Sequence, residues 1–159
     1  MMPTAGLSDI KKKINTFSSK ELVELLLKIS KYKKENKEFL SYLLFDADNQ
    51  DLFIEQLKSE IDTFYEELTP RTEYNTKKSL RKMIRLMNKY LKFASNKATE
   101  TEIRLHFCFQ WKVAKLSIRS SSSLGKIFIG QVEKVRKLIP SLHEDLQYDY
   151  GRELEGLLP

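Results

Sequence analysis

Apolar residues recur along this chain every three or four positions, which is the spacing that keeps them on one face of a helix. One long series runs from Ile54 to Leu68 and stops at Thr69-Pro70, where a proline ends a helix. Further series of this kind cover residues 7–17, 22–29, 39–43, 80–94, 124–139 and 146–157. The pattern therefore predicts successive helices from one end of the chain to the other.

One segment, EIRLHFCFQWKV (residues 102–113), alternates apolar and polar positions as a strand does. No other segment offers a strand to pair with it, and an unpaired strand cannot satisfy its backbone hydrogen bonds. As a helix continuing to Ile118, the segment has Ile103, Phe107 and Trp111 on one face. It is apolar over most of its circumference, which predicts a central, buried helix.

Four sites combine a Ser, Thr or Asp with an acidic residue three positions later, the spacing of a capping box at a helix start. The first is Ser18 with Glu21, flanked by Phe17 and Leu22 in the positions of a hydrophobic staple. The others are Asp48 with Asp51, Thr99 with Glu102, and Ser141 with Glu144. We expect helices to begin at these sites.

The sequence holds 5 Gly and 4 Pro, which favours long helices over many short strands. We expect an all-α fold of seven or eight antiparallel helices, arranged as stacked helical hairpins in a short HEAT-like array or a bundle. A length of 159 residues fits a single domain spanning 1–159.

The opening stretch SSKELVELLLKISKYKKENKEFLSYLL resembles the first hairpin of an uncharacterised bacterial family of small all-helical proteins. That family begins with a Ser-Lys-Glu cap, a leucine-rich helix and a second helix of the pattern K-E-x-x-E/K-F-L. The matching residues are Phe17, Ser18, Lys20, Glu21, Leu22, Leu25, Leu26 and 37–40. The resemblance implies a HEAT-like hairpin fold and brings no activity or site residues.

Cys108 is the only cysteine, so the chain forms no internal disulfide, and a reducing compartment is expected. The first seven residues lack the features of a secretory signal, and no stretch approaches 18 uninterrupted apolar residues. We therefore expect a soluble, cytoplasmic protein without membrane contact.

Charge is distributed unevenly along the chain. Residues 1–70 carry a net charge of −3, residues 71–140 of +13, and residues 141–159 of −4. The basic residues of the middle block fall on two helix faces, on the helices expected on either side of residue 95. The candidate polyanion-binding residues are Lys78, Arg81, Lys82, Arg85, Lys89, Lys92, Arg104, Lys112, Lys115 and Arg119.

Three interpretations of these rows stay open. They form a solvated face, or one neutralised by the acidic C-terminal segment that carries Glu144, Asp145, Asp149, Glu153 and Glu155. They bind nucleic acid or another polyanion, or they bind an acidic protein.

Motifs that suggest catalysis or metal binding are incomplete. The segment DADNQDLFIEQL (residues 46–57) lacks the glycine and the final glutamate of a calcium loop. The segment SSSSLGKI (residues 120–127) lacks the first glycine and the closing Ser or Thr of a phosphate-binding loop.

Isolated residues do not complete a site either. Glu102 and His106 share a helix face without a second such pair, and Cys108 has no assignable base. The aromatic cluster around Trp111 is more typical of a core than of a ligand pocket. No catalytic residue, metal ligand, cofactor or small-molecule substrate is therefore expected.

The expected function is that of a non-catalytic interaction or scaffold module that binds another macromolecule, by self-association or with a protein partner. The alternative is nucleic-acid binding through the basic faces of the helices spanning about 76–119. The opening stretch is expected to be a structural hairpin, with the partner site on the basic rows.

Overall fold

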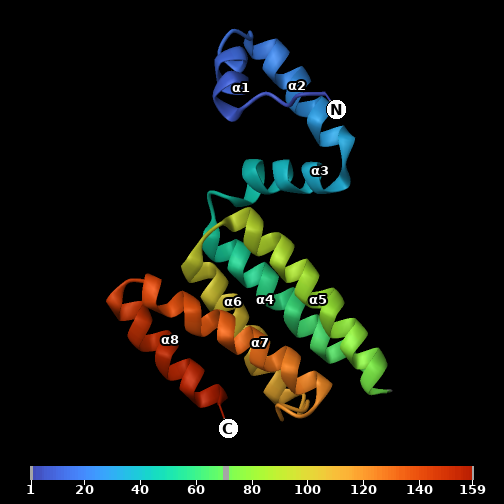
Figure 1. Cartoon of the computed structure of the whole chain (residues 1–159), viewed down its shortest axis with the longest axis vertical. Coiled ribbons are helices and arrows are strands. Elements are labelled where there is room, and N and C mark those ends of the chain that lie inside the picture. Colours follow the sequence, from blue (N-terminus) through green and yellow to red (C-terminus); the bar gives the residue numbers. More distant parts are fainter. Residues whose placement is uncertain (1, 70–71, 159) are drawn as a thin grey trace. The chain divides into compact units, whose positions relative to one another are not determined.

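The computed structural model of the chain describes residues 2–69 and 72–158, and all regular structure within these ranges is helical. The all-α prediction is confirmed. Contacts within the chain group it into two compact units, Met1–Asp48 and Asn49–Pro159 (Figure 1). The single domain spanning 1–159 stays a prediction.

The N-terminal unit consists of short helices: α1 (Leu7–Ile14), α2 (Ser19–Tyr32), α3 (Lys34–Ser41) and the π-turn η1 (Tyr42–Asp46). The predicted capping box is confirmed at the start of α2. The Glu21 amide donates to Ser18 Oγ at 3.3 Å, and the Ser18 amide donates to the Glu21 carboxylate at 2.7 Å. Asn36 Nδ2 donates to the Ile29 carbonyl at 3.0 Å, which ties α3 to α2.

The described residues of the C-terminal unit form five α-helices and one 3₁₀-turn: α4 (Gln50–Glu67), α5 (Glu73–Ala94), α6 (Lys97–Val113), α7 (Ser123–Leu138), η2 (Ile139–Ser141) and α8 (Glu144–Leu157). Helix α6 packs against α4, α5, α7 and α8. Contacts between α4 and α6 advance in the same direction along both helices, as Lys58 pairs with Glu102 and Asp62 with His106. Neighbours in sequence run in opposite directions, as Arg104 and Trp111 of α6 meet Gln131 and Phe128 of α7. Four helices around one is the arrangement of a bundle.

The prediction of a central helix is confirmed, because α6 buries eight of its residues. Trp111 is fully buried between Phe107 and Phe128, and Tyr65 of α4 packs on Phe107. The prediction that this helix continues to Ile118 was wrong. It ends at Val113, and Lys115 adopts the left-handed conformation with φ of 53°, which stops a helix of L-residues.

Three of the four predicted capping sites were wrong, each by a shift of one to three residues. Helix α4 is capped by Asn49, α6 by Asn96 and α8 by His143. Asparagine caps as well as aspartate or serine does, so Asn49 and Asn96 compete with the neighbouring Asp48 and Thr99. Each α-helix nevertheless overlaps the apolar series that predicted it.

Gly125, in the first turn of α7, allows the loop before that helix to pass close to it. A Cβ atom at this position would lie 2.0 Å from the Arg119 carbonyl oxygen. The Ser122 hydroxyl accepts a hydrogen bond from the Gly125 amide at 2.9 Å and donates one to the Arg119 carbonyl at 2.9 Å. The loop that joins α6 to α7 is therefore closed against the helix backbone.

A pair of glycine variants in α7 tests this close approach. We expect Gly125→Ala to destabilise the C-terminal unit by about 1–3 kcal/mol, because the new methyl group overlaps backbone atoms. Gly130→Ala meets no atom within 4 Å and should stabilise the helix by about 0.5–1 kcal/mol. Urea unfolding followed by the fluorescence of Trp111, the single tryptophan of the chain, measures both. Equal effects of the two variants would contradict the packing.

Candidate functional site

The basic row of α5 lies at the surface. Five of its six predicted residues are exposed and, in the part of the chain that the structure describes, have no hydrogen bond or ion pair: Lys78, Arg81, Lys82, Arg85 and Lys92. The sixth, Lys89, is half-buried, with its Nζ 4.9 Å from the centre of the Tyr90 ring. These five cations are therefore available to a ligand.

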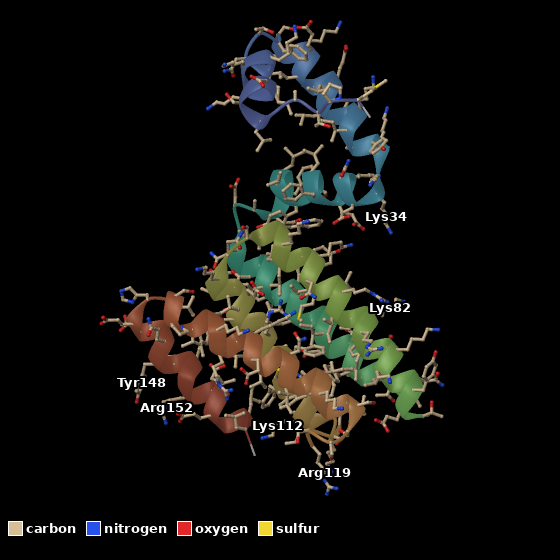
Figure 2. All side chains as sticks on the ribbon, in the orientation of Figure 1. Lys34, Lys82, Lys112, Arg119, Tyr148 and Arg152 are labelled. Atoms are coloured by element: carbon tan, nitrogen blue, oxygen red, sulfur yellow. The ribbon has the colours of Figure 1, made fainter. Side chains whose placement is uncertain are left out.

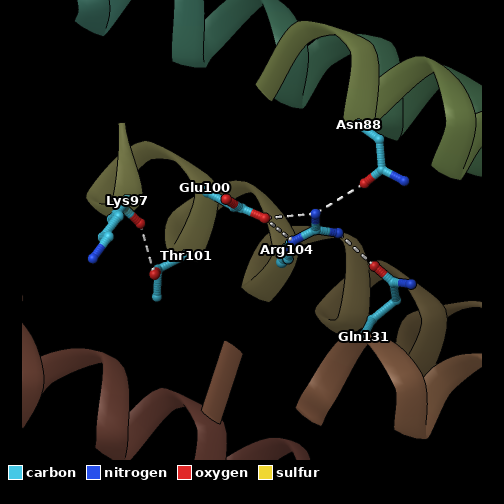
Figure 3. Close-up of polar contacts among 6 residues, drawn as sticks. All are labelled: Asn88, Lys97, Glu100, Thr101, Arg104 and Gln131. Carbon is cyan, nitrogen blue, oxygen red and sulfur yellow. Dashed lines mark hydrogen bonds and ion pairs between the residues drawn. The ribbon is translucent and has the colours of Figure 1, made fainter. Parts of the chain in front are cut away.

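The second predicted row, on α6, does not form a surface. Arg104 is only 4% exposed and lies between α5, α6 and α7 (Figure 3). Its Nη1 donates to Gln131 Oε1 at 2.7 Å, its Nη2 to Asn88 Oδ1 at 2.9 Å, and its Nε to Glu100 Oε1 at 2.8 Å. The prediction that Arg104 belongs to the polyanion-binding face is corrected, because every side of its guanidinium is engaged within the fold.

The other members of the α6 row are scattered. Lys112 points toward α8 and donates to the Gly156 carbonyl at 3.1 Å. Lys115 and Arg119 lie in the loop after α6, where both are exposed. Figure 2 shows Lys82 on one side of the C-terminal unit, with Lys112 and Arg119 elsewhere on it. The ten predicted residues are thus not brought together in one place.

The acidic residues of α8 do not neutralise the α5 row. Among the described residues, Asp145 pairs with His143 at 3.5 Å, and no carboxylate of α8 pairs with Lys78, Arg81, Lys82, Arg85 or Lys92. Glu153 lies near Glu102 and Lys58 instead, and burial followed by the charge of Glu102 raises its pKa. These five cations have no carboxylate partner from α8.

A polar cluster connects α4, α6 and α8. Lys58 Nζ lies 2.5 Å from Glu102 Oε1, and the Tyr150 hydroxyl donates to Glu102 Oε2 at 3.3 Å. Burial, together with the charge of Glu102, raises the pKa of Tyr150 to about 12. Glu102 is therefore held by two partners from other helices.

His106 lies apart from this carboxylate. Its Nε2 is 2.6 Å from Asp62 Oδ1, which also accepts a hydrogen bond from Gln110 Nε2 at 2.7 Å. The Glu102–His106 pair considered from sequence is split between two separate interhelical contacts. Both contacts join α6 to α4, and neither places a nucleophile beside a base.

The other residues considered for chemistry are likewise buried or hydrogen-bonded within the fold. Cys108 is buried, and burial raises the pKa of its thiol to about 12. A shallow depression of about 400 Å³ lies beside the start of α5. Its one carboxylate, Glu73, accepts a hydrogen bond from Ser123. In residues 2–69 and 72–158, no three His, Cys, Asp or Glu residues gather where they could hold a metal ion.

The chain matches no protein-family model, and comparison with curated proteins and with solved structures finds no significant similarity. The resemblance of the opening stretch to a bacterial family therefore stays a hypothesis, while the small all-helical fold it implied is observed. None of the helices in the described ranges is both long and apolar enough to cross a membrane.

The Arg104 contacts should stabilise the C-terminal unit strongly. We expect Arg104→Met to cost about 3 kcal/mol of unfolding free energy, because it leaves Glu100, Asn88 and Gln131 without their shared donor. The matched control is Arg136→Met, which removes an exposed ion pair with Glu133 and should cost less than about 1 kcal/mol. Urea unfolding measured by Trp111 fluorescence gives both values, and similar costs would refute the role of Arg104.

Burial also predicts the reactivity of Cys108. At pH 8 its thiol should stay protonated and react with iodoacetamide far more slowly than a free thiol, since the thiolate is the nucleophile. Mass spectrometry after timed exposure, with and without denaturing urea, measures the difference. Rapid labelling of the folded protein would contradict both the burial and the raised pKa.

Proposed function

We propose that this protein is a non-catalytic interaction module whose N-terminal helices bind a second copy of the chain. The supporting observation is that α1, α2 and α3 contain no buried residue. Leu26, Leu27 and Ile29 of α2 are each about half exposed. The hairpin expected to be the first, structural layer of a helical stack thus leaves apolar residues exposed.

Short helices without a core need a surface to pack on. Helices α1 and α3 have 8 residues each and α2 has 14, and isolated helices below about 12–15 residues are marginal in water. Most helical stability in proteins comes from burying an amphipathic face. Exposed apolar residues gathered on one small unit are typical of a protein-binding site.

The charges of α2 fit a second copy of the same helix. Glu24 and Lys31 are seven residues apart and therefore lie on the same side of α2, beside the exposed Leu27 and opposite Ile29. Among the described residues, neither has an ion pair. When two copies of α2 pack antiparallel about a two-fold axis, Glu24 of each lies beside Lys31 of the other. A parallel pairing would lack this match.

The remaining features also favour binding over catalysis. The Glu102–His106 pair is divided between structural contacts, and Cys108 is buried with a raised pKa. The sequence has one cysteine, and we infer a reducing compartment such as the cytoplasm.

Charge reversals in α2 test the self-association. Glu24→Lys alone and Lys31→Glu alone each place like charges together twice in the dimer, and each should raise its dissociation constant by about tenfold. The double variant, and an equal mixture of the two single variants, should both recover association because every contact is again between opposite charges. Sedimentation equilibrium over a concentration series measures each constant.

The control for the apolar contact is Leu27→Ser, which should weaken association without changing charge. A chain that is monomeric at every concentration would overturn the proposal. So would single variants whose mixture associates no better than either alone, since the two-fold pairing requires the rescue. If α2 is buried to the same extent at every protein concentration, its apolar residues pack within a single chain, and the proposal is overturned.

A further inference from the structure

The exposed cations of α5 follow a regular stripe. Lys78, Arg85 and Lys92 succeed one another at intervals of seven residues, as do Tyr74, Arg81 and Asn88. Two series with this interval, offset by three or four residues, lie on one side of a helix. Asn88 marks which side this is, because it accepts the hydrogen bond from Arg104 at the boundary with α7. The stripe therefore borders α7.

Helix α7 runs beside α5 in the same direction. Ser123 Oγ donates to Glu73 Oε1 at 2.6 Å near the start of both helices, and Arg104 joins Asn88 to Gln131 further along. Lys134 is one turn beyond Gln131, just as Lys92 is one turn beyond Asn88. Burial lowers the pKa of Lys134, the positive charge of Arg104 lowers it further and the negative charge of Glu100 raises it, so this lysine lies near the Arg104–Glu100 pair. The second cationic helix is thus α7, where sequence reasoning expected α6.

We propose that Lys78, Arg81, Arg85 and Lys92 of α5, together with Lys134 of α7, form a binding strip for the phosphate backbone of a nucleic acid. From Lys78 to Lys92 the strip extends about 21 Å along α5. Its cations recur every three to seven residues, and neighbours three or four apart on a helix are about 5–6 Å from each other. Flexible arginine and lysine side chains at this spacing can contact several phosphates of one strand.

Features around the strip favour a nucleic acid over an acidic protein. The only acidic residue of α5 is Glu73, which accepts the hydrogen bond from Ser123, and Glu133 of α7 pairs with Arg136. Tyr74 is 70% exposed and lies in the same stripe, where its ring can stack on an unpaired base. Two of the five cations are arginines, which can bind phosphate through two parallel hydrogen bonds.

This proposal is independent of self-association, because the strip belongs to the C-terminal unit and α2 to the N-terminal one. The two can fail separately. Charge reversals in the strip should leave the sedimentation behaviour unchanged, so a loss of nucleic-acid binding without dissociation identifies the strip alone.

The experiment measures fluorescence anisotropy of a labelled single-stranded oligonucleotide and of its duplex, titrated with the full chain across a salt series. We expect affinity to fall with salt, with a slope of log affinity against log salt of about −0.7 per neutralised phosphate for the single strand. The triple variant Arg81→Glu, Arg85→Glu, Lys134→Glu should bind at least about tenfold more weakly and flatten the slope by about 2. Comparison of the two probes shows whether a single strand or a duplex supplies the phosphates.

The matched control reverses three exposed cations outside the strip: Lys11→Glu, Lys12→Glu and Lys13→Glu, all on α1 of the N-terminal unit. It changes the net charge by the same amount, yet should alter affinity by no more than about twofold, because these lysines are not part of the strip. Equal losses in both triple variants would overturn the proposal, as would no binding at low salt. If polyglutamate competes as strongly as the oligonucleotide does at equal charge, the nucleic-acid proposal is overturned and an acidic protein is the better partner. Thermal unfolding by circular dichroism confirms that each variant is folded.

Discussion

The guanidinium of Arg104 is the point at which three helices of the C-terminal unit are joined. It starts from α6, binds Glu100 one turn earlier on the same helix, and reaches Asn88 of α5 and Gln131 of α7. A buried cation is stable only when its donors are satisfied, so the relative positions of α5 and α7 follow from this one side chain. The apolar packing of Trp111 and Phe128 fills space around it, and many sequences could do that. The Arg104 contacts fix which residues of α5 and α7 lie beside each other.

That fixed pairing decides which charges share a surface. Asn88 and Gln131 both bind Arg104. Lys92 and Lys134 follow them by one helical turn and therefore lie on the same side of Arg104. The exposed strip is thus aligned by a cation that is itself inaccessible. On α6, the same network removes Arg104 from the surface, and the hydrogen bond from Lys112 to Gly156 directs a second cation toward α8.

The sequence was sufficient for the helices and for the central place of α6, because apolar spacing reports burial directly. It was insufficient for the basic site. Residue spacing shows which side chains share one face of a helix, but it does not show which other helix packs against that face. A signal for Arg104 was present: it shares one face of α6 with Cys108 and Trp111, four and seven residues later. Glu100, four residues earlier, supplies the opposite charge such a position requires. The N-terminal helices show the opposite error. Their apolar spacing predicts buried faces, yet α1, α2 and α3 contain no buried residue.

The central place of α6 also bears on how the chain is made. This helix begins at Lys97, after more than half of the sequence, and two of the four helices that surround it come later still. During synthesis from the N-terminus, α4 and α5 emerge with apolar stripes that have no α6 to cover them. Helices α1, α2 and α3 cannot cover these stripes, because they have no core of their own. A nascent chain of this protein therefore exposes the apolar stripes of α4 and α5 until α6 has been made, which is the state that chaperones bind.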